Sequence, residues 1–318
     1  MTTALPHEFS ATDLIYNPKK FQEFFPPAKI AVFGDPVSHS RSPEMHNPAL
    51  SESEIKAQYV RIRVRADELP ASLRSLAAAG WFGANLTIPH KATAAKLVDH
   101  VDRFALLAGT VNTIVVRNDG SLSGYNTDGP GLVRAVREKF CVDIRDLKIL
   151  ILGAGGGAGR AIAVQCALEG CERLVLANRS FEKIGSLKRH LEPYFQKSGR
   201  FGFMERLVAI KLDERALSNE LPQTDLLINA TSVGMVKNLD YQLVPGLFFT
   251  PRLMVLDSVY TGGRKTQLLR DAEAKGARAT DGLSMLLHQG ALSFEIWFDR
   301  PAPLAVMRKG LVSLPQQS

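Results

Sequence analysis

A short apolar run that ends in a cluster of glycines constrains this chain more than any other segment. Residues 149–152 (Ile-Leu-Ile-Leu) have the pattern of a fully buried strand, residues 153–159 (Gly-Ala-Gly-Gly-Gly-Ala-Gly) follow, and residues 160–169 have the pattern of a helix. Glycines at such a junction allow a tight turn and a close approach to a ligand, and the helix start offers free N–H groups to an anion. The segment therefore predicts a Rossmann-type dinucleotide-binding unit.

Each small residue of this loop has an expected role in holding the cofactor. Gly153 makes the tight turn, Gly155 lets the backbone approach the pyrophosphate, and Ala158 keeps the helix close to the strand. Ala154, Gly156 and Gly157 complete the candidate cofactor-binding loop.

The end of the next predicted strand indicates which dinucleotide is bound. Residues 174–177 lead into Asn178-Arg179-Ser180, with Lys183 one helical turn later, and no carboxylate stands where an NAD binder would carry one. An arginine there can bind a 2′-phosphate with its planar donors. The alternative is an ordinary basic helix start, which the helix dipole disfavours. The four residues therefore predict NADP(H) as cofactor.

Strand-like and helix-like segments alternate nearly throughout the chain, which predicts an α/β fold with mainly parallel sheets. In the first half, residues 67–79 have a helical pattern with Asp67 as candidate cap, and residues 82–88 have a strand pattern. We expect a substrate domain at residues 1–128, completed by 282–318, and a Rossmann domain at 129–281. Residues 1–28 form an extension, whose Phe21, Phe24 and Phe25 could dock onto a surface.

Composition narrows the class of protein. The chain has 45% hydrophobic and 22% charged residues, and its net charge of +7 is scattered without a basic run, which argues against a nucleic-acid binder. No signal-peptide pattern and no apolar window of about 18 residues are present, so we expect no membrane span and a cytoplasmic location. Three cysteines without a spacing framework fit a reducing compartment, and Cys166 is expected to be a small core residue.

Five short motifs occur in an order that resembles the shikimate dehydrogenase family, from about residue 30 to residue 297. They are residues 34–47 (Gly-Asp-Pro-Val-Ser-His-Ser-Arg-Ser-Pro-Glu-Met-His-Asn), 83–91 (Gly-Ala-Asn-Leu-Thr-Ile-Pro-His-Lys), 109–113 with 124–129, 229–235 (Asn-Ala-Thr-Ser-Val-Gly-Met) and 281–290. The resemblance implies NADPH-dependent reduction of the C3 carbonyl of 3-dehydroshikimate to shikimate, with no metal.

The resemblance also implies roles for particular residues. Lys91 and Asp128 form the catalytic pair, in which Lys91 gives a proton to the developing alkoxide and Asp128 holds it in place. Substrate-binding residues are Ser40, Ser42, Asn85, Thr87, Asn112, Tyr260 and Gln289, and further cofactor-binding residues are Thr231, Ser232, Met235, Gly282 and Met285.

Several of these residues also have a plainly structural interpretation. Ser42 could cap the helix that Pro43 starts, Asp128 could cap the helix that begins at Gly129, and Lys91 could be a solvated charge. The histidines at positions 39, 46 and 90 are not spaced as metal ligands, and we interpret them as structural.

Other functions stay open at this stage. Residues 260–266 are one residue longer than is usual in the family and lack its proline, so the roles of Tyr260 and Thr266 are open. A quinate/shikimate dehydrogenase that uses NAD is one alternative, although Ser42, where quinate-preferring enzymes tend to carry threonine, favours shikimate. A catalytically silent shikimate-sensing regulator should lack the pair of Lys91 and Asp128, and a folate-type dehydrogenase does not fit Ser40 with Ser42. A monomer or a homodimer is expected.

Overall fold

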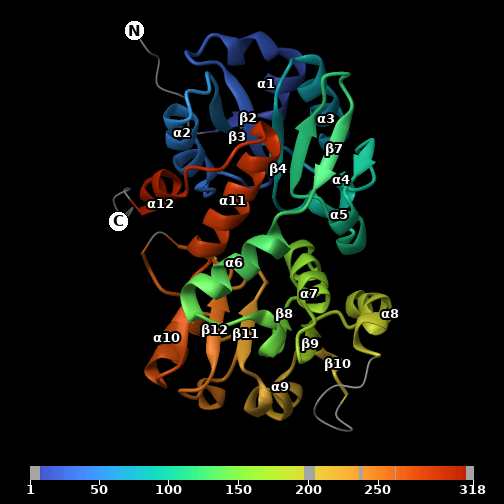
Figure 1. Cartoon of the computed structure of the whole chain (residues 1–318), viewed down its shortest axis with the longest axis vertical. Helices are drawn as coiled ribbons and strands as arrows, with labels where there is room; N and C mark the ends of the chain where they lie inside the picture. Colours follow the sequence, from blue (N-terminus) through green and yellow to red (C-terminus); the bar gives the residue numbers. More distant parts are fainter. Residues whose placement is uncertain (1–7, 197–204, 236–238, 262, 313–318) are drawn as a thin grey trace. The chain divides into compact units, whose positions relative to one another are not determined.

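A computed structural model describes residues 8–196, 205–235, 239–261 and 263–312, and these form two compact units. The first unit comprises Met1–Thr127 with Gln289–Leu314, and the second comprises Asp128–His288 with Pro315–Ser318. Each unit has its own sheet, and both sheets are mostly parallel, as the alternating pattern predicts (Figure 1). No described helix is both long and apolar enough to cross a membrane.

The sheet of the first unit has seven strands in the order β1-β3-β2-β4-β6-β7-β5. Only β6 runs antiparallel to its neighbours, because β6 and β7 form a hairpin. The strands are β1 (Phe9–Ser10), β2 (Ala28–Gly34), β3 (Gln58–Arg63), β4 (Gly83–Leu86), β5 (His100–Val101), β6 (Thr113–Val116) and β7 (Leu122–Tyr125). The predicted strand at residues 82–88 is therefore shorter than expected.

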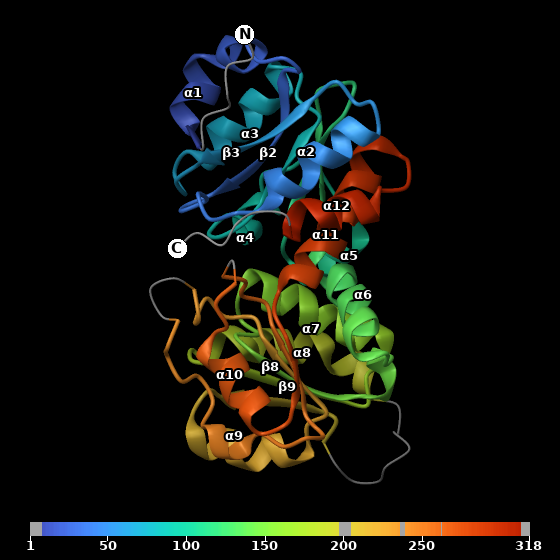
Figure 2. The same ribbon diagram turned by 90° about the vertical axis from the view of Figure 1, so that its left-hand side faces the viewer.

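Helices cover both faces of this sheet. In Figure 2, α1 (Ala11–Tyr16) and α3 (Leu69–Ala78) lie on one side of β2 and β3, and α2 (Ser42–Glu52) lies with α12 (Leu304–Val312) on the other. The contact of α12 with α2 is close, because a Cβ added at Gly310 would lie 2.2 Å from the carbonyl oxygen of Glu44. The remaining helices of this unit are α4 (Lys91–Ala94), α5 (Arg103–Ala108) and the last part of α11 (Leu283–Phe298).

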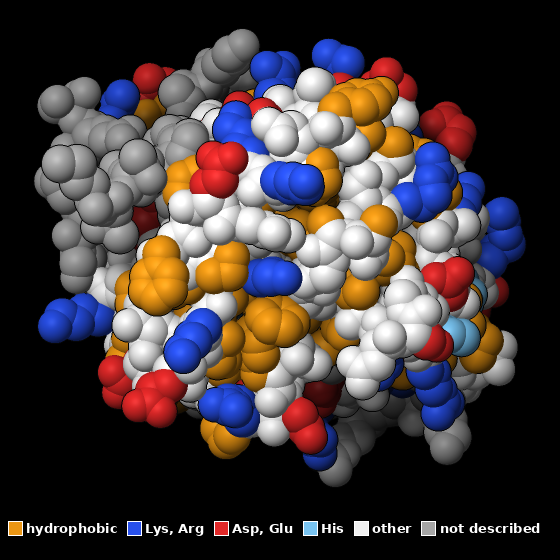
Figure 3. Space-filling view, turned by 90° about the horizontal axis from the view of Figure 1, so that it is seen from above, with side chains coloured by type: hydrophobic (Ala, Val, Ile, Leu, Met, Phe, Trp, Pro, Cys, Tyr) orange, Lys and Arg blue, Asp and Glu red, His pale blue; other side chains and the backbone are white. Residues whose placement is uncertain are grey.

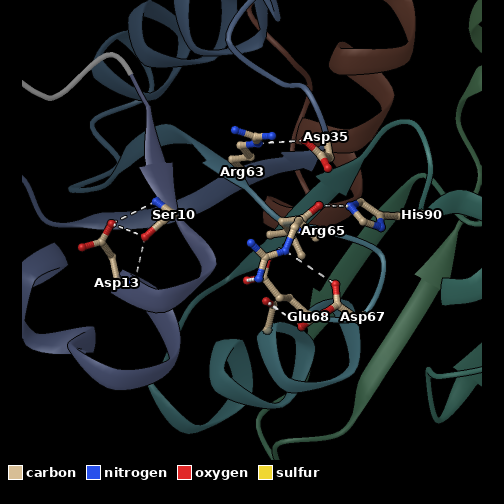
Figure 4. Close-up of polar contacts among 10 residues, drawn as sticks. Ser10, Asp13, Asp35, Arg63, Arg65, Asp67, Glu68 and His90 are labelled. Atoms are coloured by element: carbon tan, nitrogen blue, oxygen red, sulfur yellow. Dashed lines mark hydrogen bonds and ion pairs between the residues drawn. The ribbon is translucent and has the colours of Figure 1, made fainter.

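Residues 8–28 of the N-terminal extension pack on the first unit. β1 adds a parallel strand to the edge at β3, and Ser10 and Asp13 form a capping box at the start of α1 (Figure 4). Phe21, in the 3-10 helix Pro18–Gln22, is buried, and its ring lies 5.1 Å from that of Trp81. Phe24 packs against the same core, whereas Phe25 is 80% exposed, so only two of the three candidate phenylalanines dock the extension.

Local signals placed one helix cap wrongly in this unit. The N-cap residue of α3 is Glu68 and not Asp67, because the helix begins at Leu69. Asp67 instead lies 3.7 Å from the guanidinium of Arg65 on the surface (Figure 4). The carboxylate of Glu68 accepts a hydrogen bond from the backbone N–H of Arg65 at 2.8 Å and makes no side-chain cap bond to the helix.

The sheet of the second unit has the strand order β10-β9-β8-β11-β12-β13, and every pair in it is parallel. Figure 1 shows β12, β11, β8 and β9 side by side in that order. The strands are β8 (Lys148–Leu152), β9 (Arg173–Asn178), β10 (Leu207–Lys211), β11 (Leu226–Asn229), β12 (Met254–Asp257) and β13 (Arg278–Thr280). This order is that of a doubly wound Rossmann fold, in which the direction of winding reverses between β8 and β11.

Helices flank this second sheet on both sides. In Figure 2, α6 (Asp128–Phe140) and α7 (Gly157–Glu169) lie on one side of it and α10 (Gln267–Ala274) on the other. The unit also contains α8 (Glu182–Phe195), α9 (Glu214–Glu220) and the first residues of α11. Buried side chains of β8, β9, β11 and β12 form the core, including Leu150, Val175, Leu227 and Val255. Cys166 is fully buried within α7, as expected of a small core residue.

The basic side chains on one face of the molecule are scattered, as the sequence predicts (Figure 3). On the face shown in Figure 3, blue Lys and Arg side chains are spread among white and orange ones and do not gather in one patch.

Candidate functional site

Buried amide and hydroxyl side chains gather at one edge of the sheet of the first unit. Four of these side chains lie where β4 and β7 end and β6 begins, and the other two come from α11. The members are Asn85, Asn112, Thr113, Thr127, Gln289 and Ser293, each at most 8% exposed. So many buried polar groups are stable only because they bond one another, and the carboxyl edge of parallel strands is where α/β folds bind ligands.

Asn85, on β4, bonds to four groups through its side-chain amide. Its Oδ1 accepts a hydrogen bond from the hydroxyl of Tyr59 at 2.8 Å. Its Nδ2 lies 3.0 Å from the Oγ of Ser293, 3.1 Å from the Oγ1 of Thr113 and 3.2 Å from the carbonyl oxygen of Asn112. Asn85 therefore ties three strands and α11 together, which fixes the orientation of its amide.

Asn112 links the end of β7 to α11. Its Oδ1 accepts from the backbone N–H of Thr127 at 2.8 Å, and its Nδ2 donates to the Oγ1 of Thr127 at 2.9 Å and to the Oε1 of Gln289 at 3.3 Å. The structure thus brings together Asn85, Asn112 and Gln289, three residues that the resemblance implied as substrate ligands. Asp128 follows Thr127 directly in the chain and is the first residue of α6.

Lys91 begins α4, directly after the loop that leaves β4. Its carbonyl oxygen accepts from the backbone N–H of Val111 at 2.9 Å, so its main chain lies beside the residue that precedes Asn112. The side chain of Thr87 faces Gly34, where an added Cβ would lie 2.4 Å from the Thr87 methyl group. Lys91 and Thr87 are half-buried, in contrast to the fully buried amides.

Ser40 and Ser42 are buried before and at the start of α2, with their hydroxyl oxygens 3.2 Å apart. The guanidinium of Arg61 donates from Nε to the carbonyl oxygen of Ser40 at 2.7 Å and also pairs with Glu44. Ser42 does not cap the helix, because α2 begins at Ser42 itself and its N-cap residue is Arg41. The Ser42 hydroxyl is therefore not used by the helix end, contrary to the capping interpretation.

Sequence reasoning assigned no role to three members of this cluster, Thr113, Thr127 and Ser293, nor to Tyr59, which bonds Asn85 from β3. Ser293 lies four residues after Gln289 on a mostly apolar helix, and this i, i+4 polar pair was a usable signal. Tyr59 reaches Asn85 only because β3 and β4 both pair with β2. No local pattern marks that juxtaposition.

Two of the three candidate histidines, His46 and His90, have structural surroundings. The ring of His46 is fully buried and stacks on that of Tyr59 at 4.5 Å with an interplanar angle of 5°, and burial lowers the pKa of His46 to about 3. His90 Nε2 lies 2.7 Å from the carbonyl oxygen of Val64 (Figure 4). Burial lowers the pKa of His39 as well, and the positive charge of Arg61 adds to this. Within the described ranges no three His, Cys, Asp or Glu side chains are grouped to hold a metal ion.

The glycine loop of the second unit joins β8 to α7. Gly153 has φ +81°, and a Cβ there would lie 2.7 Å from Cγ2 of Thr231, so both conformation and space require glycine. The backbone N–H of Gly155 donates to Oδ1 of Asn178 at 3.3 Å. The closest approach of α7 to the loop is at Gly159, one residue beyond Ala158, where a Cβ would lie 2.3 Å from the carbonyl oxygen of Gly153.

The surroundings of this loop suit an anionic dinucleotide. Gly156, the N-cap residue of α7, contributes no side-chain cap, so the helix end can offer its N–H groups to a phosphate. Arg179 and Lys183 are exposed beyond the end of β9, and Asn178 donates from Nδ2 to the carbonyl oxygen of Ser180 at 2.9 Å. A Cβ at Gly155 would lie 2.9 Å from Cβ of Lys183, so the lysine begins beside the loop.

The other expected cofactor residues lie beyond β11, β12 and β13 of the same sheet. Thr231 donates from Oγ1 to Oδ1 of Asn229 at 2.7 Å. Gly282 is held against the turn after β12, where an added Cβ would lie 2.1 Å from the carbonyl oxygen of Ser258. Tyr260 is half-buried just after that turn. The remaining members are Ser232, which is exposed, Met235, which is half-buried, and Met285, which is buried at the start of α11.

Known proteins resemble this chain over nearly its full length. Residues 32–114 match the family described as "Shikimate dehydrogenase substrate binding domain", and residues 282–311 match "Shikimate 5'-dehydrogenase C-terminal domain". A shikimate dehydrogenase (NADP(+)) of Methanopyrus kandleri is 40% identical over 284 residues, which are 89% of this chain and 94% of the relative. One of Moorella thermoacetica is 39% identical over 89% of this chain and 92% of its own length.

A solved structure agrees with these relatives. The shikimate 5-dehydrogenase of Thermus thermophilus, crystallised in complex with NADP(H) and shikimate, has a TM-score of 0.76 at 32% identity. The match covers 89% of this chain and 98% of that one.

Proposed function

Because this chain belongs to the shikimate dehydrogenase family, we propose that it catalyses the reversible NADPH-dependent reduction of 3-dehydroshikimate to shikimate. The observation that carries the proposal is the buried cluster of Asn85, Asn112 and Gln289 in the first unit. Preoriented amides at the edge of a sheet suit a small polyhydroxylated acid, because they can exchange hydrogen bonds with its hydroxyls.

We assign the ring hydroxyls of the substrate to Asn85, Thr87, Asn112 and Gln289. The carboxylate belongs to Ser40 and Ser42, whose hydroxyls lie 3.2 Å apart. Two adjacent hydroxyl donors at the start of a helix suit an anion. Tyr260 is assigned to the substrate as well.

The second unit is proposed to hold NADP(H). The loop of residues 153–158 with the uncapped start of α7 would take the pyrophosphate, and Asn178, Arg179, Ser180 and Lys183 would take the 2′-phosphate. Residues beyond β11 and β13 would hold the rest of the cofactor: Thr231, Ser232, Met235, Gly282 and Met285. When bound, the reduced cofactor supplies the hydride.

Lys91 and Asp128 are proposed as the catalytic pair. The Lys91 ammonium gives a proton to the oxygen of the carbonyl group that is reduced, and it takes that proton back in the reverse reaction. The carboxylate of Asp128 pairs with Lys91 and accepts a hydrogen bond from the same hydroxyl, which fixes the position of that hydroxyl.

The proposal extends to the organisation of the chain. Residues 1–128 with 282–318 form the substrate domain, and residues 129–281 form the NADP domain. A cytoplasmic location fits a reductive biosynthetic step, and we expect a monomer or a homodimer.

Absorbance at the nicotinamide band, with shikimate and NADP⁺ supplied together, tests the reaction. We expect turnover of shikimate above that of quinate, and of NADP⁺ above that of NAD⁺. Arg179→Gln should lower the preference for NADP⁺ about tenfold or more, because a neutral amide cannot pair with the 2′-phosphate. Equal or faster turnover of quinate or NAD⁺ by the wild-type protein would contradict the assignments of Ser42 and Arg179, and binding of shikimate without turnover would favour a sensing regulator.

A further inference from the structure

Asp257 is a fully buried carboxylate that none of the proposed catalytic steps uses. It is the last residue of β12 and is 0% exposed. Its Oδ1 accepts from Nδ2 of Asn229 at 2.8 Å and from the backbone N–H of Val259 at 3.0 Å. Its Oδ2 accepts from the hydroxyl of Thr266 at 2.6 Å. All three donors are neutral.

This carboxylate contacts the loop after β11 through its hydrogen bond with Asn229. An ionised carboxylate can only accept hydrogen bonds, so the Nδ2 of Asn229 must face Asp257. The Oδ1 of Asn229 then faces the other way and accepts from the backbone N–H of Thr231 at 3.0 Å and from its hydroxyl at 2.7 Å. The same Nδ2 donates to the carbonyl oxygen of Val233 at 3.2 Å, so Asp257 and Val233 together hold the Asn229 amide in the orientation that binds Thr231.

Asp257 also holds the turn after β12 and the start of α10. The hydroxyl of Thr266 that donates to Asp257 also accepts from the backbone N–H of Leu269, as the N-cap of α10. Gly234 has φ +99°, and a Cβ added there would lie 2.9 Å from the methyl group of Thr266. The Val259 contact fixes the residue before Tyr260. One side chain therefore joins three segments at the carboxyl edge of the sheet.

The strand order says which half of a dinucleotide these segments face. In a doubly wound sheet, β8, β9 and β10 bind one nucleotide and β11, β12 and β13 bind the other, across the point where the strand order reverses. The basic residues Arg179 and Lys183 follow β9 and so belong to the adenosine half. The loops joined by Asp257 follow β11 and β12, and they belong to the nicotinamide half.

We propose that Asp257 is a positioning residue that orients the nicotinamide-side loops through Asn229, Val259 and Thr266. This inference rests on the proposed NADP-dependent function. A purely structural role would require only that the strands stay joined, which neutral side chains could do. The acceptor-only carboxylate binds three donors from different segments at once, and the positions that it gives to these segments are what catalysis would depend on.

Asp257→Asn tests the role of the charge with little change in shape. An asparagine at position 257 must keep its oxygen toward the Val259 N–H and Asn229, so its Nδ2 faces the Thr266 hydroxyl, which loses its acceptor, and Asn229 loses a charged acceptor. We expect NADP⁺ to bind about tenfold more weakly, and kcat to fall by between about tenfold and a hundredfold. Adenosine 2′,5′-bisphosphate, which carries only the adenosine half, should bind within about twofold of wild type. The KM for shikimate should stay within about twofold.

A pair of variants at position 266 separates position from stability. Thr266→Ser keeps the hydroxyl and should retain wild-type binding of NADP⁺, whereas Thr266→Val loses the donor and should reproduce the Asp257→Asn defect. Asp225→Asn is the matched control, because Asp225 accepts from the backbone N–H of Lys148 at 2.8 Å at the opposite edge of the same sheet. Both ligands should bind this control as they bind wild type.

Calorimetric titration of the two nucleotides measures these effects without turnover, and a melting curve accompanies each variant. If Asp257→Asn binds NADP⁺ as wild type does, or loses both nucleotides equally, the positioning role is wrong. If Asp257→Asn does not fold, the same comparison of NADP⁺ and adenosine 2′,5′-bisphosphate binding is made with Thr266→Val and Thr266→Ser. The positioning role is wrong if Thr266→Val binds NADP⁺ as Thr266→Ser does. The proposed function would be wrong if the wild-type protein bound NADP⁺ but did not oxidise shikimate. The binding measurements on Asp257→Asn would test the positioning role independently of that result.

Discussion

Replacement of Asp257 by asparagine should change how the stability of the protein depends on pH. Burial, the largest influence on this carboxyl, raises its pKa from 3.8 to about 6, and the nearby Asp281 carboxylate adds to the rise. Hydrogen bonds from Thr266, Val259 and Asn229 act in the opposite direction and lower the pKa. The folded protein therefore takes up a proton at position 257 at a higher pH than the unfolded chain does.

The sign and size of the effect follow from this difference. Because the pKa of Asp257 is higher in the folded state, its contribution to stability is fully present below pH 3.8 and is lost as the pH rises through about 6. At 1.36 kcal/mol for each unit of pKa, the difference between the folded and unfolded pKa of Asp257 corresponds to about 3 kcal/mol of stability. About 2 kcal/mol of this stability is gained as the pH falls from 7.5 to 4.5. Asparagine does not titrate, so Asp257→Asn lacks this gain.

Scanning calorimetry of wild type and Asp257→Asn at matched ionic strength measures the difference. As the pH falls from 7.5 to 4.5, the Tm of wild type relative to the variant should rise by roughly 4–8 °C, at 2–4 °C for each kcal/mol. Thr266→Val removes a donor that opposes the rise in pKa, so its transition should move to higher pH. A Tm difference that stays constant across the range would refute the buried, proton-binding carboxylate.

Three other predictions concern the catalytic base, the glycine loop and the N-terminal extension. Lys91→Ala should lower kcat by about a hundredfold or more in a steady-state assay while shikimate still binds, and an unchanged rate would remove Lys91 from the mechanism. Gly153→Ala should weaken NADP⁺ binding about tenfold or more in a titration, because a Cβ there would lie 2.7 Å from the Thr231 methyl group. Gly170→Ala, at the other end of α7 with no atom within 4 Å of the added Cβ, should leave binding unchanged. Phe21→Ala should destabilise the protein by about 3–5 kcal/mol in urea unfolding, because the side chain is buried. Phe25→Ala, at a side chain that is 80% exposed, should change stability by less than about 0.5 kcal/mol. Equal effects of the two substitutions would mean that the extension is not docked.

Much of the fold was readable from local patterns, since period and turn chemistry act over a few residues. The strands predicted at residues 149–152 and 174–177 are observed as β8 and β9 with ends that differ by at most one residue, and the glycine loop before α7 indicated the Rossmann fold from residue types alone. The family also followed from short motifs, because their order along the chain needs no knowledge of space. Local patterns placed the N-cap of α3 at Asp67, one residue before the observed Glu68, because sequence patterns define the ends of helices less sharply than their interiors.

Contacts between distant segments were decided only in three dimensions. Nothing near Tyr59 in the chain shows that its hydroxyl reaches Asn85, because that bond depends on both strands pairing with β2. Asp257 likewise has an unremarkable position at a strand end, and its link to Asn229 exists because β11 and β12 pair in register. The hydrophobic pattern of a sequence indicates which face of a strand or helix a residue lies on. The hydrogen-bond partner of a buried polar group depends instead on strand order and register.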